Sequence, residues 1–201
     1  MKELSRYSGN SHGVPEFEDR KLMWQTLEVT KVDLNFPNTH ELIELLRGLY
    51  LGGAVKFQSF QIGESEVLDW YISRNQFSEC FFFWKIWTVK GIIKALPIDN
   101  LKEDLHRDFM VSSPYHLAGD FASMISWGGA YESSKLSGRE IMNVSQKAAE
   151  EIIGDDFKNV SVYINSLAWC DFFDDVAWDN TIVVLNKETR FLHVLMATDT
   201  D

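Results

Sequence analysis

The stretch TIVVLNKETRFLHVLMA, residues 181–197, decides the fold class of this 201-residue chain. Its two ends, residues 181–186 and 191–197, are rich in β-branched and large apolar residues, which favour β-strands. The polar KETR between them has the length and composition of a hairpin turn. The sequence therefore predicts an antiparallel β-hairpin, from which the rest of the fold can be built outward.

Other segments add strands to this hairpin. Residues 54–62 alternate between two faces, with Val55 and Phe57 on one face and Phe60 and Ile62 on the other, as in a strand. The run ECFFFWKIWTVKGIIKALPI, residues 79–98, is too aromatic and β-branched for a solvent-facing helix. It is predicted to form one or two buried strands at the centre of the sheet. Further strands are expected in residues 26–36, 67–73 and 159–169.

Three helices have recognisable ends in the sequence. Asn38 is placed to cap the first, with Glu41 reaching back to the cap, and the pair of glycines at 52 and 53 ends it. Residues 116–127 carry an apolar stripe at helical spacing and stop at a second glycine pair. The third helix follows Ser137 and Glu140, which stand at capping-box spacing. A short charged helix is also expected in residues 101–109.

These segments together predict an α+β fold. The expected architecture is a single domain, residues 16–201, with a mostly antiparallel sheet and three or four helices packed on it. Residues 1–15 are rich in Ser, Gly and Asn and are expected to form a flexible N-terminal arm. The apolar content of 45%, with 14 Phe, seven Trp and six Tyr, is sufficient for one sizeable core.

Charge narrows the function classes. The chain has a formal net charge of −11, and residues 150–201 alone carry 11 acidic and three basic side chains. A concentrated negative field repels nucleic acid and attracts cationic partners, so nucleic-acid binding is not expected. The first 20 residues lack the apolar run of a signal peptide, and no segment has the length of a membrane helix, so a soluble cytoplasmic protein is expected. Cys80 and Cys170 are expected to be reduced core thiols.

The candidate functional site is CDFFDDVAWD, residues 170–179, which combines four aspartates with three aromatic rings. Carboxylates beside aromatic rings suit an interface with a basic protein, because the rings bury area and the charges steer encounter. The same aspartates could form a solvated face without a role, or ligate a hard cation, although their spacing lacks the features of a calcium loop. The predicted partner-binding residues are Asp171, Phe172, Phe173, Asp174, Asp175, Trp178 and Asp179.

The sequence has no recognisable catalytic motif. Its glycines lack the spacing of a phosphate-binding loop, there is no nucleophile elbow, and the five histidines are scattered along the chain. His193 lies within the apolar run FLHVLMA and is expected to be a buried histidine bonded to a neighbour. Asp171 beside Cys170 disfavours a reactive thiolate. We therefore expect a protein that is not an enzyme and has no cofactor or metal.

In overall type the chain resembles bacterial immunity proteins, which neutralise toxins and in particular nuclease toxins. Like them it is small, acidic, rich in aromatic residues and predicted to be α+β. The resemblance implies a cytoplasmic protein that occludes a cognate toxin with a basic surface. Two other classes stay open: a metal-assisted hydrolase that uses the same aspartates, and an adaptor or ligand-binding module that uses aromatic residues such as Trp84 and Trp87.

Overall fold

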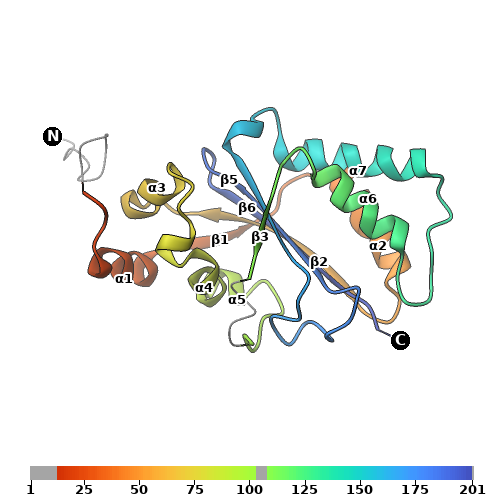
Figure 1. The fold of residues 1–201 in the computed structure, drawn as a ribbon, viewed down its shortest axis with the longest axis horizontal. Coiled ribbons are helices and arrows are strands. Elements are labelled where there is room, and N and C mark those ends of the chain that lie inside the picture. Colours follow the sequence, from red (N-terminus) through yellow and green to blue (C-terminus); the bar gives the residue numbers. More distant parts are fainter. Residues whose placement is uncertain (1–12, 103–107, 201) are drawn as a thin grey trace.

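The computed structural model describes residues 13–102 and 108–200, which form one six-stranded antiparallel sheet flanked by helices (Figure 1). The strands follow the order β1-β2-β6-β5-β4-β3 across the sheet. Their bounds are β1 Val29–Val32, β2 Ala54–Ile62, β3 Met110–Ser112, β4 Val160–Asn165, β5 Asn180–Asn186 and β6 Phe191–Thr198. The α+β class and the antiparallel sheet predicted from the sequence are confirmed.

Seven α-helices lie in the described residues, where three or four were expected. Figure 1 shows them in two groups, with α1, α3, α4 and α5 at one end of the view and α2, α6 and α7 at the other. Their bounds are α1 Phe17–Thr26, α2 Pro37–Leu49, α3 Glu66–Ile72, α4 Phe82–Lys85, α5 Lys90–Ile93, α6 Leu117–Trp127 and α7 Gly138–Ile153. Each group belongs to a separate core, because the two groups cover opposite faces of the sheet.

The period-two alternation of the strands divides the core. Val183 and Leu185 of β5 pack with the group that contains α1, α3, α4 and α5, whereas Ile182 and Val184 pack with the group that contains α2, α6 and α7. Strand β6 alternates in the same way and lies between β2 and β5. The predicted hairpin is therefore confirmed, and it forms the middle of the sheet.

Two predicted strands are helical, and both predictions were wrong. Residues 67–73 fall mainly in α3, where Ser65 caps the helix by accepting a hydrogen bond from the Leu68 amide. Residues 79–98 contain α4, α5 and the short 3₁₀ turns η1 (Ser78–Cys80) and η2 (Ile86–Thr88), which cover one face of the sheet instead of forming its centre. The apolar side chains of these helical turns pack against the sheet. In the sequence, such a short apolar run cannot be distinguished from a buried strand.

Several helix and strand ends differ from the predicted ones. Strand β1 covers only four residues of the expected 26–36, and Thr26 belongs to α1. Strand β4 likewise ends at Asn165, before the expected Trp169. The expected helix at 101–109 lies mostly outside the described residues, as do residues 1–12 of the expected arm.

Helix α2 is capped by a distant carboxylate and not by its own residues. It begins at Pro37, and the Asn38 side chain makes no capping bond to the helix. Instead, Glu151 of α7 accepts hydrogen bonds from the backbone amides of Asn38 (3.2 Å) and Thr39 (2.7 Å). A carboxylate at a helix N-terminus satisfies free amides and the helix dipole together. The predicted box at Ser137 and Glu140, by contrast, is present at the start of α7.

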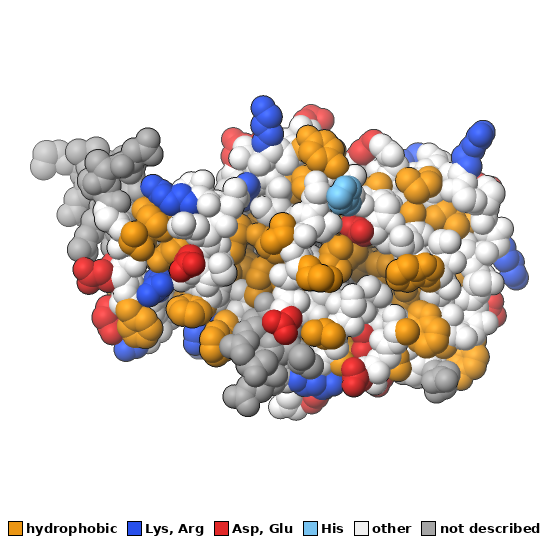
Figure 2. Space-filling model, viewed as in Figure 1, with side chains coloured by type: hydrophobic (Ala, Val, Ile, Leu, Met, Phe, Trp, Pro, Cys, Tyr) orange, Lys and Arg blue, Asp and Glu red, His pale blue; other side chains and the backbone are white. Residues whose placement is uncertain are grey.

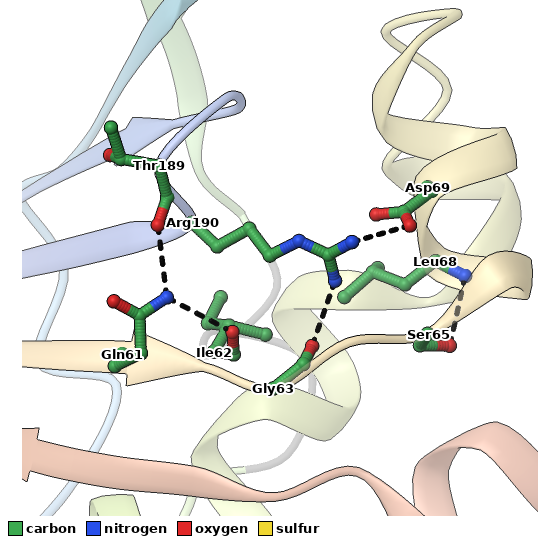
Figure 3. Close-up of polar contacts among 8 residues, drawn as sticks. All are labelled: Gln61, Ile62, Gly63, Ser65, Leu68, Asp69, Thr189 and Arg190. Carbon is green, nitrogen blue, oxygen red and sulfur yellow. Dashed lines mark hydrogen bonds and ion pairs between the residues drawn. The ribbon is translucent and has the colours of Figure 1, made fainter.

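The turn of the central hairpin is tied to the helical layer (Figure 3). Arg190 has a backbone φ of 59° and donates to Asp69 of α3 (2.5 Å) and to the Gly63 carbonyl (2.9 Å). Burial raises the pKa of Asp69, and the Arg190 charge opposes that rise without reversing it. This ion pair links α3 to the hairpin turn.

Candidate functional site

The predicted site forms a loop between β4 and β5, here called the acidic loop, residues 171–179. Both ends of the loop are held by hydrogen bonds to β5 and β6, on the face of the sheet that carries Val183 and Met196. Trp169 is buried and its indole N–H donates to the Thr181 hydroxyl at 2.7 Å. Asp179 is 1% exposed and accepts hydrogen bonds from the Thr198 hydroxyl (2.6 Å) and the Val176 amide (3.1 Å). Contacts within the chain therefore hold both ends of the loop.

The seven predicted residues divide into surface and interior. Asp171, Asp174 and Asp175 are exposed, and among the described residues neither Asp174 nor Asp175 has an ion pair. Asp171 accepts a hydrogen bond from the Asn100 side chain. Phe173, which is 4% exposed, lies in the core with Asp179. Phe172 and Trp178 are half-buried.

The two half-buried rings belong to different cores. Phe172 packs against the core on the side of α1 and α3, and Trp178 packs against the core on the side of α2 and α7. Trp178 is therefore mainly an anchor of the loop. The exposed acidic side chains of the loop are those of Asp171, Asp174 and Asp175.

The acidic residues of the last quarter do not form one continuous patch. Glu151 caps α2, and Asp199 is fully buried, where its carboxylate accepts from the amides of Gly52 (2.7 Å) and Ala130 (2.6 Å). Asp155 and Glu188 lie near the turn of the β5–β6 hairpin, at the opposite end of β5 from the acidic loop. The local charge of the acidic loop is accordingly smaller than the sequence count suggested.

His193 and Ser59 form the contact that most resembles catalytic machinery. The Ser59 hydroxyl lies 2.8 Å from Nδ1 of His193, on paired positions of β2 and β6. Both side chains are 3% exposed, and Phe57 stacks on the imidazole. Burial lowers the pKa of His193 to about 4, so the ring is neutral at pH 7. The predicted buried histidine with a bonded neighbour is confirmed.

The metal-ligating and thiol groups are dispersed or buried. Within the described residues no cluster of three or more His, Cys, Asp or Glu side chains is arranged to hold a metal ion. Cys80 and Cys170 are free and buried, and burial raises the pKa of each thiol to about 12. Both thiols are therefore protonated at neutral pH.

A second surface feature was not predicted from the sequence. A groove of about 570 Å³ lies between α1 and the α4–η2 segment. Four aromatic rings line it, namely Phe17, Trp24, Phe81 and Trp84, and we call it the aromatic groove. Figure 2 shows hydrophobic, basic and acidic side chains intermingled on the surface over α1 and α4. Phe17 and Trp84 are 61% and 43% exposed, which is unusual for such large apolar side chains.

The groove brings together residues about sixty positions apart in the sequence, which explains why it was missed. One signal was available, because Phe17, Arg20 and Trp24 recur at the spacing of a single helix face. Reading it required recognising α1, which the sequence analysis did not predict. Phe81 has a φ of 57°, and no pattern in the sequence indicates that conformation.

No family model, curated protein or solved structure matches this chain. In the part of the chain that the structure describes, no helix is long and apolar enough to cross a bilayer. The functional argument is therefore based on the chemistry of the acidic loop and the aromatic groove.

Proposed function

We propose that this protein binds a basic partner protein through the acidic loop and neutralises it by stoichiometric occlusion, in the manner of the immunity proteins it resembles. The supporting observation is the combination of a fixed base with unpaired charge. Trp169, Phe173 and Asp179 hold the loop in place, while Asp174 and Asp175 have no ion pair among the described residues.

Such an arrangement favours binding for two physical reasons. A loop that is already ordered loses little conformational entropy when it docks, so more of the contact energy contributes to affinity. Carboxylates without internal ion pairs are available for steering and for pairing with Lys or Arg side chains of a partner. The partner is expected to be a bacterial toxin with a basic surface. Nuclease toxins have such a surface because they bind phosphates.

The proposal also specifies where and how the protein acts. A toxin that attacks intracellular targets must be intercepted in the cytoplasm, so the immunity protein is expected there. Occlusion needs no reacting group on the immunity protein, and the neutral His193 and the protonated thiols agree with that role. Substitution of Trp178 is a poor test of binding, because its ring packs against a core.

The test uses the toxin encoded beside the gene, inactivated at its catalytic centre, and titrates it into the full chain by calorimetry. Asp174→Lys combined with Asp175→Asn is the appropriate variant, since Asn tolerates the φ of 64° at position 175 better than Lys does. We expect a 1:1 complex of the wild type and a dissociation constant raised about 10- to 100-fold by the variant.

The matched control is Asp155→Lys, which reverses an exposed charge at the other end of β5. It is expected to bind the toxin as the wild type does. If the neighbouring toxin stays equally toxic when the wild-type protein is co-expressed, or if the loop variant binds as tightly as the control, the proposal is wrong.

A further inference from the structure

The aromatic groove is basic, although the chain as a whole is acidic. Arg20, Lys21 and Lys85 line it together with the four rings, and no Asp or Glu is among its described lining residues. The net charge of the chain is −11. Lys21 also has an exposed ion pair with Glu18 of α1 at 3.6 Å, whereas no ion pair of Lys85 is found among the described residues. An aromatic surface lined by cations favours an occupant with carboxylates and apolar side chains.

Contacts within the chain hold the side chains of the groove in place. The Arg20 guanidinium donates to the Glu79 carbonyl at 2.8 Å and lies 5.6 Å from the centre of the Phe81 ring. The Trp24 indole N–H donates to the Cys80 carbonyl at 2.7 Å. Phe81 and Trp84 meet edge to face at 5.9 Å, and this pair separates the groove from a second aromatic hollow of about 400 Å³.

The acidic loop has the complementary chemistry. It presents the exposed carboxylates of Asp171, Asp174 and Asp175, and Phe172 and Trp178 in the same loop are half-buried. Its anchors at Phe173 and Asp179 keep it at one end of β4 and β5, so it does not fold into the groove of its own chain. A second copy of the chain can supply it.

We propose that the acidic loop of one copy docks in the aromatic groove of another, head to tail. The contact joins two different surfaces, so each added copy leaves one groove and one loop free, and the chains either extend or close into a ring. Each contact pairs loop carboxylates with Lys85 and with Lys21, which exchanges its exposed ion pair with Glu18 for the loop. It also covers the exposed rings of Phe17 and Trp84. The same loop is used in the proposed function, so a bound toxin and a second copy compete for it.

The test measures self-association of the full chain by sedimentation velocity over a wide concentration range. Salt is held at about 0.15 M, where a screening length of about 8 Å suppresses the repulsion between two acidic molecules but not contacts at short range. The groove variant is Lys21→Glu with Lys85→Glu, and the loop variant is Asp174→Lys. All three substituted side chains are exposed, so each variant is expected to fold.

The decisive measurement is the mixture of the two variants. Each variant alone lacks one of the two complementary surfaces and is expected to sediment as a monomer, with self-affinity reduced about tenfold or more. Mixed together, they retain one intact loop and one intact groove, and they are expected to form a 1:1 dimer that grows no further. The controls, Lys90→Glu with Lys94→Glu and separately Asp155→Lys, make the same charge changes outside both surfaces and should associate as the wild type does.

A further groove variant, Phe17→Ser, removes a 61% exposed ring without changing charge and should weaken association in the same way. A wild type that stays monomeric at every concentration overturns the proposal. The proposal is also wrong if the mixture of the two variants fails to associate. It is wrong again if the chain forms a closed dimer that neither variant weakens, such as one paired through the exposed edge strand β3. If the wild-type chain self-associates as expected but does not bind the toxin, the proposed function is wrong and the head-to-tail contact still stands.

Discussion

His193 illustrates how one buried side chain makes stability depend on pH. Its imidazole is enclosed by Phe57 and Phe36, and its Nδ1 contacts the Ser59 hydroxyl at 2.8 Å. The pKa is lowered from 6.5 to about 4 because burial penalises the charged ring. The folded protein therefore binds the proton less readily than the unfolded chain.

The pH dependence of folding follows from that difference. The stabilising contribution is fully present above pH 6.5, decreases as the unfolded chain takes up the proton, and is lost once the pH falls through about 4. A shift of this size corresponds to about 3 kcal/mol of unfolding free energy. We expect urea denaturation between pH 7 and pH 4 to show this loss in the wild type but not in His193→Asn. Parallel pH profiles for the two proteins would contradict the assignment.

The acidic loop shows which site features the sequence could predict at the level of single residues. The composition of residues 170–179 correctly indicated exposed carboxylates, since Asp171, Asp174 and Asp175 are at the surface. It did not indicate that Asp179 is buried, because that depends on the Thr198 hydroxyl, nineteen positions along the chain. Hydrogen bonds between distant residues leave no local pattern in a sequence.

At the scale of elements, helices with a clear amphipathic period and strong caps were predictable, and short helical turns were not. Helix α7 has both a capping box and an apolar face, and its prediction was confirmed. Helices α4 and α5 have four residues each, too few for a period to appear. Their aromatic and β-branched residues favour strands locally, and packing against the sheet overrides that preference.

Helix α5 makes a close approach that can be tested against a second glycine. A Cβ added at Gly91 would overlap the carbonyl oxygen of Val29 in β1, whereas a Cβ at Gly119 in α6 would meet no atom within 4 Å. Gly91→Ala is therefore expected to lower the free energy of unfolding by about 2–3 kcal/mol. Gly119→Ala is expected to raise it by about 0.5–1 kcal/mol, because alanine favours the helix.

Urea denaturation of the two variants beside the wild type measures both changes. The comparison is informative because the chemical change is identical and only the surroundings differ. A neutral Gly91→Ala would mean that α5 is free to move away from β1, and that its contact with the sheet edge contributes little to stability.

For the whole molecule, the sequence predicted one antiparallel sheet but assigned its centre to the wrong segment. Residues 79–98 are the most apolar run of the chain, and apolar content alone does not distinguish a central strand from helices laid over the sheet. The centre is occupied by β5 and β6, whose side chains are buried on both faces. The side chains of β5 and β6 are buried on both faces because helices cover both faces of the sheet.

Because β5 and β6 contribute side chains to both cores, we expect the two cores to unfold together. Leu46 of α2 and Leu68 of α3 are fully buried in opposite cores, and replacing either by Ala should cost about 2–5 kcal/mol. Trp70, Trp87 and Trp169 lie in the core that contains Leu68, whereas Trp178 packs against the opposite core. The measurements are therefore made in a Trp178→Phe background, in which the buried tryptophans report on the Leu68 core. Leu46→Ala is nevertheless expected to shift the fluorescence midpoint as far as the circular dichroism midpoint. The costs in the double variant should add within about 0.5 kcal/mol, since the sites are far apart. A fluorescence midpoint that stays in place while the dichroism midpoint falls would mean that the central hairpin does not couple the two faces.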